Sequence, residues 1–171
     1  MKKNVLIIGT GTIGEPLIGL LSDFKKKLGI NVYFHKRTPL IDEIPKVNSL
    51  ISRGAILVVD SDKAEAFRKL GHVPALEYEA VLRMSDVVID CTPAGNIAKK
   101  THYLPLTNER YCATKKKKRT FIAQGSENGF GMPYAYGIND EALVKCTPNF
   151  IQVVSCNTHN IASLVVTVCP T

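Results

Sequence analysis

Residues 5–14 read VLIIGTGTIG, a continuous apolar run that leads directly into a glycine-rich loop. Such a run is typical of a strand buried on both faces of a parallel sheet. Beyond the loop, apolar residues recur at helical spacing from Leu17 to Phe24. Pro16 lies in the first turn, where its missing N–H is tolerated, and Gly29 follows the last turn. The pattern predicts a strand, a glycine loop and a helix.

The rest of the chain alternates in the same way between apolar strands and helical segments. We expect further strands at residues 32–34, 55–59, 86–91, 120–123 and 150–154. We expect helices at 42–53, 62–70 and 78–84, from the turn at 92–95 to about residue 102, and at 157–168. We expect a basic surface loop at 104–119 and an irregular, glycine-rich segment at 125–137. Strands that alternate with helices form right-handed βαβ units. The sequence therefore predicts an α/β fold of Rossmann type, a doubly wound, mostly parallel sheet with helices on both faces.

Composition narrows the class of protein. The 171 residues carry a formal net charge of +7, much of it in Lys25–Lys27 and in residues 115–119. This charge suits a polyanionic partner, and nucleotide phosphates qualify as well as nucleic acid. A basic run in a loop is usually a solvated surface, and no aromatic residues of the stacking kind interleave with this one. We therefore expect no nucleic-acid partner, and binding through residues 115–119 is the less favoured alternative.

The five cysteines are odd in number, and no two form a C-x-x-C pair. Zinc-ligand spacing is absent, so we expect no metal site and a reducing, cytoplasmic setting. The apolar run that follows Met1 is too short for a signal peptide and is broken by glycines. No stretch of the sequence is long enough to span a bilayer, so we expect no membrane partner.

The loop from Gly9 to Gly14 has the G-x-G-x-x-G spacing of dinucleotide-binding turns, between a strand and a helix. Gly9 would allow the tight turn, Gly11 the close approach of the backbone to a pyrophosphate, and Gly14 close packing of helix on strand. The N–H groups of Thr12 and Ile13 would face the phosphates. The alternative is a glycine turn in an α/β domain that binds no cofactor.

The end of the second expected strand bears on the choice of cofactor. NAD sites usually have an acidic residue about 20 residues beyond the loop. This chain has no Asp or Glu between Phe24 and Ile41. It has Lys36, Arg37 and the hydroxyl of Thr38 instead, which suit a 2′-phosphate. We expect the chain to accept NADP, and NAD use stays open; the alternative is a solvated basic strand end.

Cys156 stands in VVSCN, residues 153–157, where a strand is expected to run into a helix. There the positive end of the helix dipole would lower the thiol pKa from about 8.5 toward roughly 3.5–7.5. Ser155, Asn157 and Thr158 supply donors that could hold an oxyanion. Cys156 is therefore a candidate nucleophile.

Each cysteine also has a structural explanation as a small buried apolar residue. For Cys91, inside the apolar run at residues 88–91, we favour that explanation. His159 shares a helix face with Cys156, but a side chain at that position rarely reaches past the start of its helix. We therefore expect His159 to be a structural histidine and not the catalytic base.

Four segments together resemble one family. They are GTGTIG at residues 9–14, IDCTPAG at 89–95, AQGSE at 123–127 and VVSCN at 153–157. In this order along the chain they resemble the N-terminal part of the type II, or archaeal-type, phosphorylating glyceraldehyde-3-phosphate dehydrogenases. The last segment is the most specific, since the nucleophilic cysteine of that family stands in an SCN turn between strand and helix.

The resemblance implies an oxidoreductase of glycolysis or gluconeogenesis. With NAD or NADP it would oxidise glyceraldehyde 3-phosphate to 1,3-bisphosphoglycerate, through a thioester on Cys156 that inorganic phosphate cleaves. The resemblance also implies roles for single residues. Thr12, Ile13, Thr92, Pro93 and Gly125 would contact the cofactor. Ser155, Cys156 and Asn157 would form the site of substrate binding, with Cys156 as the nucleophile. The alternatives are another semialdehyde or acyl-phosphate dehydrogenase, and a catalytically dead NADP-binding module.

The resemblance also implies a domain division. Residues 1–154 would form the dinucleotide-binding domain, and residues 155–171 the start of a catalytic domain that carries the base in the family. Because the chain stops at Thr171, we expect a truncated gene product or fragment that binds cofactor but turns over poorly. The last helix would lack its packing partner, and its apolar face would favour association. The family implies a homo-oligomer, a tetramer at full length.

Overall fold

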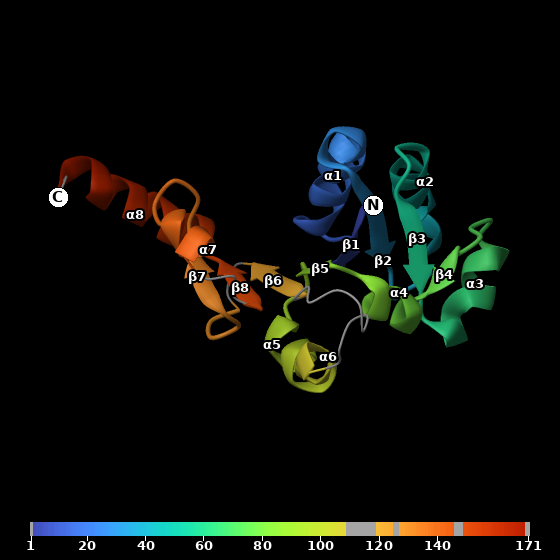
Figure 1. Cartoon of the computed structure of the whole chain (residues 1–171). Coiled ribbons are helices and arrows are strands. Elements are labelled where there is room, and N and C mark those ends of the chain that lie inside the picture. Colours follow the sequence, from blue (N-terminus) through green and yellow to red (C-terminus); the bar gives the residue numbers. More distant parts are fainter. Residues whose placement is uncertain (1, 109–118, 125–126, 146–148, 170–171) are drawn as a thin grey trace. The chain divides into compact units, whose positions relative to one another are not determined.

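The computed structural model describes residues 2–108, 119–124, 127–145 and 149–169. The chain divides into two compact units, coloured along the sequence in Figure 1. The N-terminal unit comprises Met1–Thr92 and Tyr111–Arg119. The C-terminal unit comprises Pro93–Arg110 and Thr120–Thr171.

Five parallel strands form the sheet of the N-terminal unit. They are β1 (Lys3–Ile8), β2 (Ile30–His35), β3 (Ile56–Val59), β4 (Leu76–Glu77) and β5 (Val87–Asp90). Their order is β4-β3-β2-β1-β5, and every pair is parallel. The chain leaves β1 toward β2 and later returns to β5 on the other side of β1. Ligands of open α/β sheets bind at such a reversal, beyond the carboxyl ends of the strands. The glycine loop follows β1 at this point.

Four helices connect these strands. They are α1 (Gly14–Leu28), α2 (Ile44–Ser52), α3 (Ala64–Lys69) and α4 (Tyr78–Met84), with 3-10 turns at Ile41–Glu43 and Ser61–Lys63. Gly29 ends α1 in the left-handed region, at φ +63°, and its N–H bonds the carbonyls of Lys25 and Lys26. Helix α1 therefore ends where the sequence predicts.

The strand residues alternate between two apolar layers. On one side Ile7, Val32 and Phe34 pack in one cluster with Ile18 of α1 and with residues of α2 and α3. On the other side the ring of His35 packs against that of Tyr78 of α4, with centroids 4.3 Å apart and the planes tilted by 36°. Both faces of this sheet are therefore covered by helices, and the predicted Rossmann-type α/β fold is confirmed.

The C-terminal unit has a smaller parallel sheet. Its strands are β6 (Thr120–Gln124), β7 (Met132–Tyr134) and β8 (Phe150–Val153), in the order β6-β8-β7. Its helical segments are α5 (Gly95–Ala98), a π-helical turn (Lys99–Tyr103), α6 (Leu104–Asn108), α7 (Glu141–Lys145) and α8 (Cys156–Val168). Strand β8 leads directly into α8.

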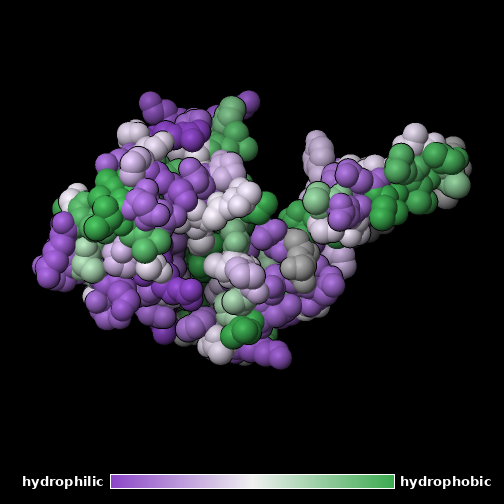
Figure 2. Space-filling view, turned by 180° about the vertical axis from the view of Figure 1, so that it is seen from behind, coloured by the Kyte–Doolittle hydropathy of each residue, from purple (hydrophilic) through white to green (hydrophobic). Residues whose placement is uncertain are grey.

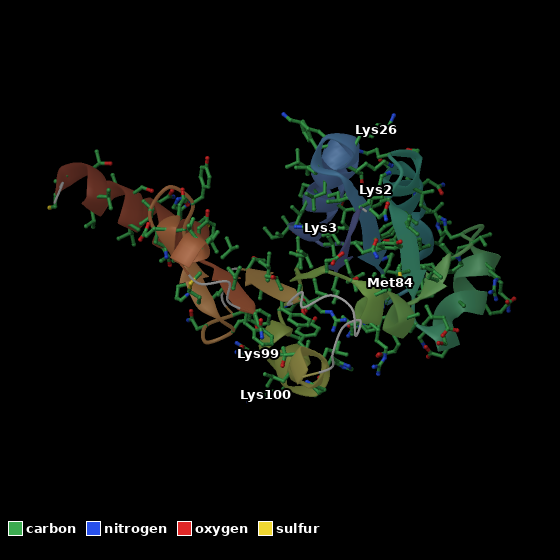
Figure 3. All side chains as sticks on the ribbon, in the orientation of Figure 1. Lys2, Lys3, Lys26, Met84, Lys99 and Lys100 are labelled. Carbon is green, nitrogen blue, oxygen red and sulfur yellow. The ribbon has the colours of Figure 1, made fainter. Side chains whose placement is uncertain are left out.

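Aromatic rings form the core of this unit. Phe121 stacks on Tyr103 and on Phe150, with ring centroids 4.8 and 5.1 Å away, and Phe130 meets Tyr103 and Phe150 edge-on. Lys99, labelled in Figure 3, holds its ammonium 4.8 Å from the centre of the Phe150 ring and donates to the carbonyl of Phe130. The helical segment is thereby tied to the sheet by packing and by a cation–π contact.

Two expectations about loops are wrong in part. Residues 104–108 of the expected surface loop form α6, and Arg119 is buried, where it donates to the carbonyls of Arg83 and Ser85. The expected irregular segment at 125–137 contains β7, which pairs with β8. The short strand β4 and helix α7 lie in segments where the sequence predicted no element. The domain boundary at residue 154 stays a prediction.

Within the described residues, no helix has the length and apolar character that a bilayer span requires.

Candidate functional site

The glycine loop needs two of its glycines for steric reasons. Gly9 has φ +93°, which residues with side chains rarely adopt, and its N–H donates to the carbonyl of His35. A Cβ on Gly14 would lie 2.0 Å from the carbonyl oxygen of Gly9. The first turn of α1 can therefore approach the end of β1 only with glycine at position 14.

The third glycine faces open space. Among the described residues, a Cβ on Gly11 would meet no atom within 4 Å, and Thr12 and Ile13 beside it are exposed. The helical bonding begins here, since Glu15 N–H donates to the Gly11 carbonyl, and the first N–H groups of a helix have no acceptor within it. Open space, free donors and the positive helix end together fit a phosphate group. The loop therefore fits the pyrophosphate of a dinucleotide.

The end of β5 lies beside this loop. Asp90 is buried, and one of its oxygens accepts from the backbone N–H of Thr92 at 2.9 Å and from its hydroxyl at 2.7 Å. The methyl group of Thr92 would lie 3.2 Å from a Cβ on Gly9. Thr92 is thus placed at the loop, as a cofactor contact would need to be. Pro93, the next residue, is exposed and begins the C-terminal unit.

Lys36 is not the free cation that its sequence position indicates. Its side chain is only 6% exposed, and its ammonium is bound to the carboxylate of Glu43. The other oxygen of Glu43 accepts from Lys46 of α2 at 2.8 Å. These two lysines lower the pKa of Glu43, with the hydrogen bond from Lys36 the largest cause. Arg37, by contrast, is exposed.

Lys46 connects this cluster to the glycine loop. Its ammonium lies 3.4 Å from the Thr10 carbonyl and 3.5 Å from the carboxylate of Glu15. The hydrogen bond with Glu43 is the main reason why the pKa of Lys46 is raised. Sequence reasoning missed Glu43 and Lys46. The available signal was an acidic pair, Asp42 and Glu43, a few residues beyond the basic end of the strand.

Cys156 is the first residue of α8. Ser155 precedes it as the N-cap, and its hydroxyl oxygen accepts the N–H of Thr158 at 3.2 Å. The Cys156 thiol is exposed, and the side-chain oxygen of Asn157 lies 4.0 Å from its sulfur. The expected strand-to-helix turn is therefore present, and the sulfur stands at the positive end of a 13-residue helix.

Two other candidate residues, His159 and Cys91, have structural surroundings of their own. The ring of His159 is 3.0 Å from the carbonyl of Tyr136 through Nε2, which fits the structural role expected for it. Cys91 packs against the apolar core, and burial, with the charge of Asp90, raises its pKa to about 11. Gly125, Cys112 and Cys146 lie outside the described residues. Within the described ranges, no three His, Cys, Asp or Glu side chains cluster as a metal site would need.

The outer face of α8 is apolar. Five of its aliphatic side chains are between 52% and 75% exposed: Ile161, Leu164, Val165, Val166 and Val168. Figure 2 shows hydrophobic residues gathered on the segment that carries this helix. The exposed apolar face that the sequence predicted is present, and association through it stays a prediction.

Positive charge also gathers far from the loop. Lys2, Lys3 and Lys26, labelled in Figure 3, lie around the amino end of β1 and the last turn of α1. The glycine loop lies at the opposite, carboxyl edge of the same sheet. This part of the net charge therefore has no direct contact with the loop.

A doubly wound parallel sheet with a G-x-G-x-x-G turn at its central strand defines a Rossmann-like protein. A scan against protein-family models finds no match. Among known proteins, glyceraldehyde-3-phosphate dehydrogenases of Pyrobaculum islandicum and Pyrobaculum calidifontis match 91% of this chain, with 29% and 31% identity. The counterpart from Pyrobaculum neutrophilum is 31% identical over the same share. The chain is a distant homologue of these archaeal dehydrogenases and spans 41% of their length.

Proposed function

We propose that this chain carries the cofactor site and the nucleophile of an NAD(P)-dependent phosphorylating glyceraldehyde-3-phosphate dehydrogenase. The observation that carries the proposal is the place of Cys156 at the start of α8, directly after the N-cap Ser155, in a chain homologous to archaeal glyceraldehyde-3-phosphate dehydrogenases. The reaction would be the oxidation of glyceraldehyde 3-phosphate to 1,3-bisphosphoglycerate with inorganic phosphate. A cytoplasmic location goes with this proposal.

The N-terminal unit would hold the cofactor. The N–H groups of Gly11, Thr12 and Ile13 would bind its pyrophosphate at the positive end of α1. Thr92 would line the same side of the loop, next to Gly9. When bound, the nicotinamide would supply the hydride acceptor.

The C-terminal unit would supply the nucleophile. The Cys156 thiolate would attack the aldehyde carbon, and the N–H groups at the start of α8 would hold the resulting oxyanion. Once that carbon has lost its hydride, the acyl group would remain on sulfur as a thioester. Inorganic phosphate would then form the acyl phosphate and release the thiolate. Ser155 and Asn157 flank the sulfur and would contact the substrate.

The chain by itself should turn over slowly. The ring of His159 is engaged with the carbonyl of Tyr136, and we assign the general base to the part of the relatives that this chain does not span. Losing a general base typically costs about 10²–10⁴-fold in rate. We therefore expect cofactor binding and a reactive thiol, with little steady-state turnover.

Two measurements on the full chain test the proposal together. Calorimetric titration with NAD and NADP reports binding at the loop. Mass spectrometry after brief treatment with iodoacetamide at neutral pH reports which cysteine reacts first, with Cys156→Ser as the control. Binding of at least one dinucleotide, together with labelling of Cys156 ahead of Cys169, which is also exposed, supports the proposal. Absence of binding refutes it.

The same measurements separate the alternatives. Tight binding with an unreactive Cys156 indicates a catalytically dead NADP-binding module. If both results are positive, the chain is incubated with glyceraldehyde 3-phosphate and with acidic semialdehydes in the presence of cofactor. A stable acyl adduct on Cys156 from the semialdehydes alone would assign the chain to another aldehyde or acyl-phosphate dehydrogenase.

A further inference from the structure

A closed cluster of charges lies where β2 ends. Lys36 and Lys46 both bind Glu43, and Lys46 also lies 3.5 Å from Glu15. Lys36 is the best shielded from water, since the side chains of Lys36, Glu43 and Lys46 are 6%, 22% and 26% exposed, whereas that of Glu15 is 45% exposed. Its two cations are therefore matched by two carboxylates.

The position of the cluster connects it with a bound dinucleotide. Lys36 is the first residue after β2, and Rossmann folds bring the ribose 2′ position of the cofactor to this strand end. Lys46 donates to the carbonyl of Thr10 inside the glycine loop. The cluster thus extends from the loop to the place where NAD and NADP differ.

The charges of Lys36, Lys46 and Glu43 favour a 2′-hydroxyl over a 2′-phosphate at this strand end. A phosphomonoester carries about −1.5 to −2 charges at neutral pH, and it needs cations with free donors. Here Glu43 already takes a hydrogen bond from each lysine. A 2′-phosphate would have to displace the Glu43 carboxylate or lie beside it. Two negative groups in direct contact repel each other, so both arrangements weaken binding. A 2′-hydroxyl carries no such penalty and can donate to a carboxylate.

We propose that Glu43 sets the choice between the two dinucleotides, by occupying Lys36 and Lys46, two of the cations at this strand end that a 2′-phosphate would use. In the chain as it stands Glu43 favours NAD and limits, without abolishing, the affinity for NADP. The inference rests on the proposed dinucleotide site and adds a residue that governs its specificity.

The variant Glu43→Gln tests this directly. It removes one negative charge, keeps an acceptor for Lys36 and frees donors on both lysines. We expect the ratio of NADP to NAD affinity, measured by calorimetry on the full chain, to rise about tenfold or more. The affinity for NAD should change much less.

Asp42→Asn is the matched control. It makes the same change in charge one residue away, at an exposed side chain that has no ion pair within the described parts of the chain. The affinity ratio should stay within about twofold of the original, because a solvent-exposed charge is screened. If both variants shift the ratio equally, the effect is general electrostatics and the proposal is overturned.

Lys46→Met keeps the proposal testable should Glu43→Gln fail to fold. Without Lys46, Glu43 loses a partner and the site loses a cation, so the ratio of NADP to NAD affinity should fall several-fold. An unchanged ratio overturns the proposal. If the unaltered chain binds dinucleotide and these variants leave the ratio unchanged, only the role of Glu43 fails. If the chain binds neither dinucleotide, the proposed function itself fails.

Discussion

Replacing Gly14 by alanine should destabilise the N-terminal unit by about 1–3 kcal/mol. The new methyl carbon would lie 2.0 Å from the carbonyl oxygen of Gly9 and 2.9 Å from its carbonyl carbon. Both are backbone atoms, so no side chain can rotate away, and either the start of α1 or the end of β1 must shift. Alanine's better helix propensity offsets at most about 1 kcal/mol of this cost.

Gly11→Ala is the matched comparison, because a Cβ there meets nothing within 4 Å. Urea unfolding followed by circular dichroism should find this variant as stable as the unaltered chain, or more stable by up to about 1 kcal/mol. Calorimetry should find its dinucleotide affinity lowered at least about tenfold, because the methyl group occupies the side open to phosphate. The steric reasoning is refuted if Gly14→Ala unfolds at the same urea concentration as the unaltered chain.

Three further predictions concern other parts of the chain. Ser155→Ala removes the N-cap of α8 and should lower the free energy of unfolding of the C-terminal unit, measured in urea, by about 0.5–2 kcal/mol. Ser155→Thr keeps a hydroxyl and should be about as stable as the original. Equal losses in the two variants would contradict the capping role. His72 is buried, and its Nε2 has no hydrogen-bond partner among the described residues. Burial lowers the pKa of His72 from 6.5, so as the pH falls this histidine is protonated in the unfolded chain before it is protonated in the folded one. Stability should therefore be fully present above about pH 6.5 and fall as the pH drops below it, and His72→Asn should flatten this dependence in thermal unfolding between pH 7 and pH 5. Leu164→Lys, at a side chain that is 65% exposed, should shift sedimentation toward monomer while the unfolding midpoint stays unchanged; a lower midpoint with unchanged sedimentation would show that this face of α8 packs within the chain.

Elements set by local sequence could be predicted. The apolar run of β1, its glycine loop and the start of α8 behind Ser155 depend on neighbouring residues, and all three form where the sequence indicates. The same holds for Gly29, whose left-handed conformation depends on the missing Cβ alone. Local propensity and hydrophobic spacing are sufficient for such features.

Features that depend on distant contacts could not be predicted. Strands β4 and β7 have two and three residues, too few to show a periodic pattern, and they form because a neighbouring strand offers its edge. Arg119 ends a strongly basic run, yet it is buried because the carbonyls of Arg83 and Ser85 lie within reach of its guanidinium. Neither partner is near it in the sequence.

In the candidate site, too, the features set by local sequence could be predicted and those set by more distant contacts could not. The tight turn expected at Gly9 and the close packing expected at Gly14 are present, because each depends on local backbone geometry, and the phosphate role of Gly11 stays a prediction. The ion pair of Lys36 could not be predicted from the adjacent residues, because it depends on how the loop after β2 brings Glu43 back to the Lys36 ammonium. A basic strand end in the sequence is therefore a neutralised cluster in the structure.

The most direct test of the account is a titration of the isotopically labelled chain with NAD and NADP, followed through backbone amide chemical shifts. Binding of the dinucleotide at the glycine loop predicts saturable shifts that are largest at Gly11, Thr12 and Ile13, and that disappear in Gly11→Ala. Shifts that spread over the lysine-rich surfaces without saturation, or no shifts at the loop, would contradict it.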